Sequence, residues 1–115
     1  AEVVRKHPAE VNDFHVAPEV NPKEGLPFHE WFIEFEKAPE DLTFFAKALD
    51  VVLQNKNPYY KDLIVGKVLR PLKISTVKRN GFRKYMSSEG RLGGQNKVPR
   101  LANDRKIANK IKKFK

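Results

Sequence analysis

The fold is decided by residues 28–36, which read Phe28-His29-Glu30-Trp31-Phe32-Ile33-Glu34-Phe35-Glu36. Trp31, Ile33 and Phe35 share one face of this segment. The glutamates Glu30, Glu34 and Glu36 share the other. An alternation of period two is typical of a strand with one buried face. We therefore interpret residues 28–36 as a strand, with the solvated face of that strand carrying the glutamates rather than a general acid/base pair.

A second strand is indicated just upstream, over Val11 to Ala17, where the alternation is weaker. Residues 21–25 (Asn-Pro-Lys-Glu-Gly) form a turn-rich connection between the two segments. We expect the strands to be antiparallel neighbours. His15 and His29 could then face each other, but we interpret both as surface or partly buried strand residues.

A helix is predicted after the second strand. Pro39 suits the first helical position, and Glu40 and Asp41 place negative charge in the first turn. Leucine, phenylalanine and valine recur at helical spacing between residues 42 and 53, which predicts one core-facing stripe. Asn55, Asn57 and Pro58 are expected to end this helix.

The second half of the chain predicts a further strand and two further helices. Residues 68–78 are interpreted as a strand, with Pro71 restricting its first half to an edge or a bulge. Asn80 is expected to cap a short helix that runs to Glu89. Residues 101–115 are expected to form an amphipathic helix that is rich in lysine. The order of elements predicts the α+β class, a single domain over residues 1–115 with a small mixed or antiparallel sheet and helices packed on it.

Charge is divided unevenly along the chain. The 115 residues contain 23 Lys/Arg and 14 Asp/Glu, a net charge of +9. Residues 1–50 carry 5 basic and 11 acidic side chains, whereas residues 51–115 carry 18 basic and 3 acidic ones. The basic half is therefore expected to attract phosphates, nucleic acid or an acidic protein surface.

Several classes of function are excluded by the sequence. The chain has no cysteine, which removes disulfides, thiolate zinc sites and cysteine nucleophiles and fits a cytoplasmic protein. The three histidines lack metal-ligand spacing, so we predict no metal site in this chain. We find no apolar run of membrane-spanning length, and no signal peptide. Because the sequence begins at Ala1, we expect a processed chain or a piece of a larger protein.

A glycine-rich segment over residues 90–97 presents a lysine, Lys97. It does not match the phosphate-binding loop GxxxxGK[ST], because the residue immediately before Lys97 is Asn96 rather than a glycine, and Val98 follows it. Glycine lets a backbone approach phosphate closely. The pattern therefore favours a loop that delivers a lysine to a site elsewhere, although most lysines in so basic a chain only aid solubility.

Three patches in this sequence resemble the C-terminal domain of the auxin-responsive (Gretchen Hagen) acyl-acid–amido synthetases, specifically its bacterial relatives. The most specific patch is Gly93-Gly94-Gln95-Asn96-Lys97-Val98-Pro99-Arg100. The other two are residues 13–16 leading into 29–35, and the segment Val68-Leu69-Arg70-Pro71-Leu72. Together the patches span about 90 residues, in the family's order.

The resemblance implies a lid-type C-terminal domain of an adenylate-forming enzyme. Such enzymes use ATP and magnesium to convert a carboxylic acid to an acyl-adenylate, and an amino acid's amine then forms the amide. The implied partners are an N-terminal adenylating domain of the same protein and the carboxylic acid and amino acid substrates. Nothing in this chain corresponds to that large domain, so we expect no activity from the chain alone and no cofactor bound to it.

By the same resemblance, Lys97 is the catalytic residue, a mobile loop lysine that reaches the active site. Gln95, Asn96 and Arg100 are the residues expected to position the loop or contact the phosphates of ATP.

An alternative interpretation is a free-standing basic module that binds nucleic acid or an acidic protein partner through residues 91–115. This stretch has only one aromatic residue, Phe114, whereas single-strand binders stack bases on several. We therefore do not expect nucleic acid to be the partner, nor a membrane.

Overall fold

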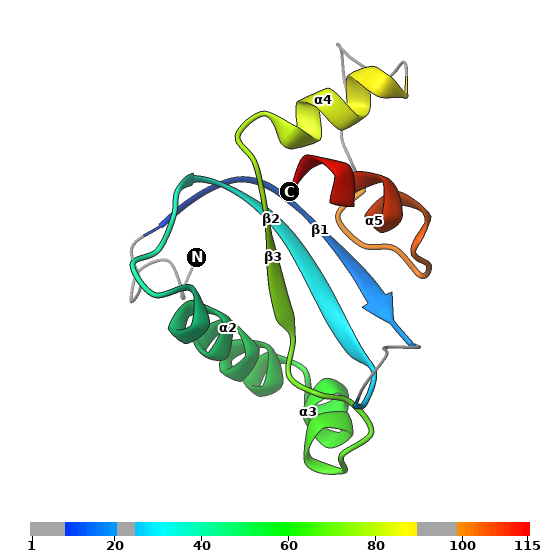
Figure 1. Cartoon of the computed structure of the whole chain (residues 1–115). Helices are drawn as coiled ribbons and strands as arrows, with labels where there is room; N and C mark the ends of the chain where they lie inside the picture. Colours follow the sequence, from blue (N-terminus) through cyan, green and yellow to red (C-terminus); the bar gives the residue numbers. More distant parts are fainter. Residues whose placement is uncertain (1–8, 21–24, 90–98) are drawn as a thin grey trace.

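The computed structural model describes residues 9–20, 25–89 and 99–115. It contains a mixed three-stranded sheet in the order β1-β2-β3, with helices on both faces (Figure 1). β1 spans Glu10–Glu19 and pairs antiparallel with β2, Phe28–Lys37. β3, Lys73–Val77, pairs parallel with β2. The predicted α+β class and the antiparallel pair are confirmed.

The alternating pattern of residues 28–36 runs along nearly the whole of β2. β1 pairs with β2 over this whole length, so both strands are long. His15 lies opposite Phe32, and Val16 lies opposite Trp31. His29 lies opposite Pro18, so the two histidines do not face each other. The two histidines are offset along the pair, and they stand on opposite faces of the sheet because their positions in this register differ in parity.

β3 is shorter than predicted, since only residues 73–77 pair with β2. The chain before it contains Pro71, which cannot donate to a ladder. Leu72 instead gives its backbone N–H to the Asp50 carboxylate at 3.1 Å. A helix side chain therefore replaces the sheet hydrogen bond that the first half of the predicted strand would have made.

Two helices, α2 (Leu42–Lys56) and α3 (Pro58–Val65), follow β2. The start of α2 differs from the prediction. Asp41 is its N-cap and accepts from the Phe44 N–H at 3.0 Å, so Pro39 and Glu40 lie outside the helix. Asn57 does end α2, and it also caps α3 by accepting from the Tyr60 N–H at 3.2 Å.

The remaining helices are α4 (Gly81–Ser88) and α5 (Lys106–Ile111), with a short 3₁₀ turn η1 (Lys112–Phe114) after α5. Asn80 is at the N-cap of α4 as predicted, but its backbone is left-handed (φ 66°) and its side chain makes no cap bond. The final helix begins later than expected, because residues 99–102 run along β1 before α5 starts. A Cβ on Gly81 would collide with Val77, which explains glycine at the start of α4.

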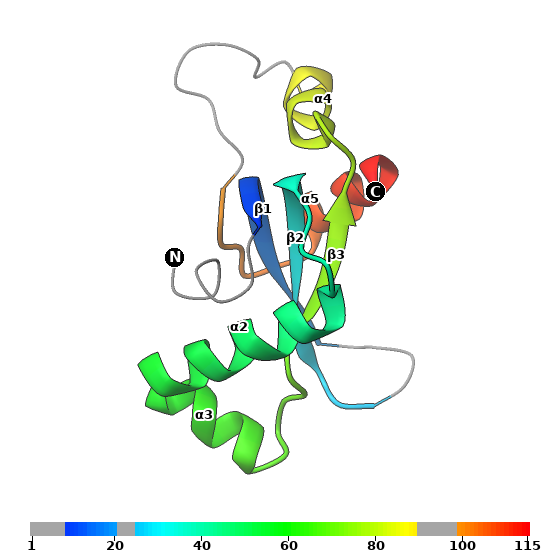
Figure 2. The same cartoon turned by 90° about the vertical axis from the view of Figure 1, so that its left-hand side faces the viewer.

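Helices lie against both faces of the sheet (Figures 1 and 2), and each face has its own core of buried side chains. On one face, Phe32 of β2 is fully buried among residues of α4 and α5. On the other, Phe45 of α2 packs against Phe35 of β2 and Ile74 of β3. The segment that leads into α5 is thereby brought to the edge of the sheet, against β1.

Candidate functional site

Three of the four predicted site residues, Gln95, Asn96 and Lys97, lie outside the described part of the chain. Their roles stay predictions. Arg100 is described, and it begins the segment that returns from the glycine-rich sequence to the sheet. The candidate site is therefore built from what holds residues 99–105 in place.

Residues 99–102 form a short parallel addition to the outer edge of β1. The Val16 N–H donates to the Arg100 carbonyl at 2.8 Å, and the Ala102 N–H donates to the Val16 carbonyl at 3.0 Å. These two bonds make an isolated parallel bridge between Val16 and Leu101 rather than a full strand. The chain is thus fixed to the sheet immediately after the segment that contains Lys97.

The Arg100 side chain lies over strand β1 and stays largely open to solvent. Its guanidinium carbon is 5.1 Å from the centre of the Phe14 ring, and Nε is 3.9 Å from a carboxylate oxygen of Asp13. Phe14 is in turn stacked on Trp31, with ring centres 5.5 Å apart and planes 19° apart. Both contacts are long and hold the guanidinium only weakly, and 62% of the Arg100 side chain is exposed. Its donors remain accessible to a phosphate, which fits the predicted role without testing it.

His15 lies on the opposite face of β1 and is completely buried. Its Nδ1 is 2.5 Å from the Pro99 carbonyl oxygen. Burial lowers the pKa of His15 below 6.5, and Arg105 lowers it further, whereas the bond to Pro99 and the charges of Asp104 and Asp13 act to raise it. The ring is therefore neutral near pH 7 and joins the end of the loop sequence to β1.

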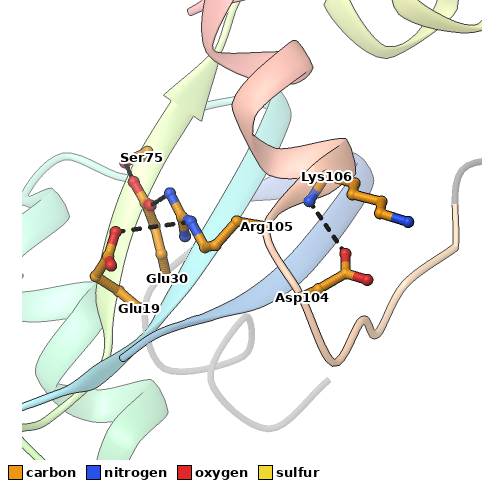
Figure 3. Close-up of polar contacts among 6 residues, drawn as sticks. All are labelled: Glu19, Glu30, Ser75, Asp104, Arg105 and Lys106. Carbon is orange, nitrogen blue, oxygen red and sulfur yellow. Dashed lines mark hydrogen bonds and ion pairs between the residues drawn. The ribbon is translucent and has the colours of Figure 1, made fainter. Parts of the chain in front are cut away.

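Arg105, just before α5, joins the same segment to the middle of the sheet (Figure 3). Its Nη2 donates to the Glu30 carboxylate at 2.8 Å, and its Nε lies 3.6 Å from Glu19. Ser75 of β3 donates to the other Glu30 oxygen at 2.5 Å. Burial raises the pKa of Glu30, but the Ser75 and Arg105 hydrogen bonds and the Arg105 charge outweigh it, so the net pKa is below 4.5.

The interpretation of the β2 glutamates as a solvated face is wrong for two of the three. Glu30 is 9% exposed and Glu34 is 5% exposed, and only Glu36 is an exposed residue. Glu34 accepts from the Asn12 amide at 3.0 Å and from the Phe82 N–H at 3.2 Å. These carboxylates are buried because partners distant in sequence satisfy them. The apolar Phe32 between them was the sequence signal for a second buried face.

The described residues hold no group of three or more histidine or acidic side chains that could bind a metal ion. His29 stacks on Tyr60, with ring centres 5.7 Å apart, and burial lowers its pKa below 6.5.

No helix in the described part of the chain is long and apolar enough to cross a bilayer.

A cavity of about 450 Å³ lies between α2 and residues 70–74. Apolar side chains form most of its wall, with the cations Lys47, Arg70 and Lys73 also on its lining. Arg70 and Lys73 each stand 4.8 Å from the centre of the Phe28 ring. No local pattern in the sequence indicated this cavity, because its walls come from two segments separated by α3.

Comparison with known protein families identifies the chain. The model described as the GH3 family C-terminal domain matches residues 1–106. The chain belongs to the GH3 family. This confirms the resemblance carried by the three sequence patches, while the likeness to bacterial relatives stays an expectation.

Solved structures show the same fold as this GH3 domain. A structure titled "GH3.15 acyl acid amido synthetase" matches with a TM-score of 0.75 and 16% identity, over 98% of this chain and 21% of the other. A second, titled "AtGH3.15 acyl acid amido synthetase in complex with 2,4-DB", matches with a TM-score of 0.74 and 15% identity, over the same shares of the two chains. The present chain thus spans about a fifth of the length of these structures. The search of curated proteins found no match.

Proposed function

We propose that this GH3 domain serves an ATP-dependent acyl-acid–amino acid ligase and works with an N-terminal adenylating domain of the same protein. The observation that carries the proposal is the match to the GH3 C-terminal domain over residues 1–106. The names of the two solved structures, acyl acid amido synthetases, support the class of reaction. The cytoplasm remains the proposed location.

The proposed reaction has two steps. A carboxylate oxygen attacks the α-phosphorus of ATP, and pyrophosphate leaves with the electrons of the broken bond. The amine of an amino acid then attacks the acyl carbon, AMP leaves, and the amine gives up a proton. Magnesium would offset charge on the nucleotide phosphates. In this proposal it is held by the phosphates and by the adenylating domain, because the described residues offer no group of ligands for it.

Lys97 is the proposed catalytic residue of the first step. Two negatively charged groups approach each other there, and further charge develops on the phosphoryl oxygens. An ammonium group placed between them stabilises the transition state more than the ground state. Placing that lysine on a glycine-rich segment of a small domain would allow its withdrawal before the amine enters.

Arg100, Gln95 and Asn96 are proposed to hold the nucleotide phosphates or the loop itself. Of these, Arg100 is the one that the structure describes. Its exposed guanidinium lies on β1, three residues after Lys97 in the chain. A second cation at that spacing fits a polyphosphate, whose charges extend over several ångströms.

The test is ATP–pyrophosphate exchange, which measures adenylate formation alone, in the protein that carries this domain together with its adenylating domain. A panel of aromatic, aliphatic and indole carboxylic acids serves as the acyl substrates. Lys97→Ala should lower the exchange rate by about tenfold or more, whereas Lys113→Ala, a change at an exposed lysine of η1, should leave it unchanged. Exchange with none of the acids, or an unchanged rate in Lys97→Ala, would contradict the proposal.

A further inference from the structure

The end of the loop sequence is held on β1 by three hydrogen bonds, and one of them depends on a side chain. Two are backbone bonds between Val16 and residues 100 and 102, which any sequence makes in this conformation. The third joins His15 Nδ1 to the Pro99 carbonyl oxygen. Pro99 has no N–H of its own, so this carbonyl is its only backbone hydrogen-bonding group.

The chemistry of this bond fixes the state of the His15 ring. A carbonyl oxygen only accepts, so the proton must be on Nδ1, and Nε2 of the neutral ring carries the lone pair. Nε2 is buried and has no hydrogen-bond partner among the described residues. A second proton there would be a buried, unpaired charge close to the Arg105 cation. The neutral ring therefore donates one hydrogen bond, from Nδ1 to the Pro99 carbonyl oxygen.

The same segment is fixed again six residues later. Arg105 holds Glu30 at 2.8 Å, and its guanidinium lies over the Phe32 ring, which His15 also contacts. Two side chains thus hold residues 99–105 against the face of the sheet that α4 and α5 cover. His15 comes from β1, and Arg105 belongs to the segment itself. The Arg105 contacts set the start of α5, and the His15 contact sets the position of Pro99.

We infer that His15 is the positioning residue for Lys97, an inference that rests on the proposed function. One residue, Val98, separates Lys97 from Pro99 in the chain, so their Cα atoms are at most about 7 Å apart. A shift of Pro99 therefore shifts the backbone from which the Lys97 side chain must reach the reacting phosphate. A misplacement of about 1 Å at a reacting centre can lower a rate by about a hundredfold. His15 acts through Lys97 and touches no substrate.

Three variants of His15 test this in the protein that carries both domains, with the most active acid of the panel. His15→Phe fills the buried space but cannot donate, and should lower pyrophosphate exchange by about tenfold. His15→Asn places an amide N–H where Nδ1 stood and should restore most of the rate. His15→Gln places its amide near the Nε2 position instead and should remain slow. The Asn and Gln variants give the same comparison if His15→Phe fails to fold.

A double-mutant cycle separates positioning from general loss of structure. In a Lys97→Ala background, His15→Phe should change the exchange rate by less than about twofold, because the residue through which it acts is gone. Amide hydrogen exchange of the peptide over residues 99–105 should quicken in His15→Phe. His29→Phe, which removes a half-buried histidine from the opposite face of the sheet, should change neither measurement.

Each outcome has one meaning. A normal rate in both His15→Phe and His15→Gln overturns the inference, while a slow Lys97→Ala variant leaves the proposed function standing. An equal loss on His15→Phe with and without Lys97 also overturns it, because His15 would then act on structure alone. A normal rate in Lys97→Ala overturns the proposed function together with this inference.

Discussion

Glu30 and Arg105 form an ion pair of 2.8 Å across 75 residues of sequence, with only 12% and 16% of their side chains exposed. The carboxylate lies on the central strand, and the guanidinium lies just before the last α-helix. The second carboxylate near Arg105, Glu19, is at 3.6 Å. A single cation therefore ties the C-terminal segment to both long strands, and Ser75 adds β3 to the same group.

The first prediction concerns the cost of breaking this pair. Glu30→Gln leaves the Arg105 charge buried with only the more distant Glu19, so the free energy of unfolding should fall by about 3 kcal/mol. Glu36→Gln is the matched control, since Glu36 is on the same face of the same strand and its ion pair with Arg79 is largely exposed. It should cost less than about 1 kcal/mol. Urea denaturation of the 115-residue chain measures both, and equal losses would contradict the prediction.

The sheet was predictable because its two long strands carry their own pattern. Trp31, Ile33 and Phe35 recur at every second position and share one face of the observed β2, although only Ile33 of the three is buried. The glutamates were misassigned because alternation shows which face is apolar but not whether the polar face meets solvent. Glu30 can be buried because Arg105 pairs with its charge. No local pattern in the sequence connects two residues that are 75 positions apart.

The candidate site was only partly predictable for the same reason. The three patches, including the motif around Lys97, indicated the family that the match over residues 1–106 confirms, and Arg100 lies on β1 with an exposed guanidinium. His15 gave no signal as a contact of Pro99, because the strand pattern described only its neighbours in β1 and β2. The addition of residues 99–102 to the edge of β1 is a tertiary contact, and it displaced the first turns of the predicted final helix.

The second prediction concerns Asp50, a buried carboxylate of α2. It accepts hydrogen bonds from the Tyr60 hydroxyl, the Leu72 N–H at 3.1 Å and the Gln54 amide at 2.6 Å. Asp50→Ala leaves the two buried donors unpaired, at about 1–3 kcal/mol each. We expect a loss of about 2–5 kcal/mol by chemical denaturation.

Two further variants isolate that effect. Tyr60→Phe removes one donor together with its bond, so it should cost about 1 kcal/mol. Asp62→Ala, an exposed acid of α3, should be within about 0.5 kcal/mol of the unmodified chain. A loss in Asp50→Ala no greater than that in Tyr60→Phe would show that the Leu72 bond contributes nothing.

The third prediction concerns Asn57, which ends α2 and begins α3. Its side chain accepts from the Tyr60 N–H, and its own N–H donates to the Leu53 carbonyl. Asn57→Ala keeps the second bond and loses the first, so the free energy of unfolding should fall by about 1 kcal/mol. Asn55→Ala, inside α2 and exposed, should be neutral or slightly stabilising because alanine is the better helix former. Thermal unfolding followed by circular dichroism distinguishes the two, and a higher midpoint for Asn57→Ala than for Asn55→Ala would contradict the capping role.

The last prediction follows from two histidines, the buried His15 and the half-buried His29. Burial holds the pKa of both His15 and His29 below the 6.5 of an unfolded chain. Below that pH the unfolded state binds protons that the folded state does not, so the free energy of unfolding should fall as pH falls. Each histidine adds a slope of at most about 1.4 kcal/mol per pH unit until its folded pKa is reached.

The lowered pKa of Glu30 acts in a separate window. Its contribution is complete above the unfolded value of 4.5 and is lost as pH falls from there through the lower folded pKa. Denaturation between about pH 7.5 and about pH 5.5 therefore reports the histidines without the glutamate. His15→Phe should flatten the dependence in that range, and His29→Phe should flatten it independently, because the two rings lie on opposite faces of the sheet. If His15→Phe leaves the slope unchanged, His15 is protonated in the folded chain as readily as in the unfolded one, and the neutral single-donor contact with Pro99 is wrong.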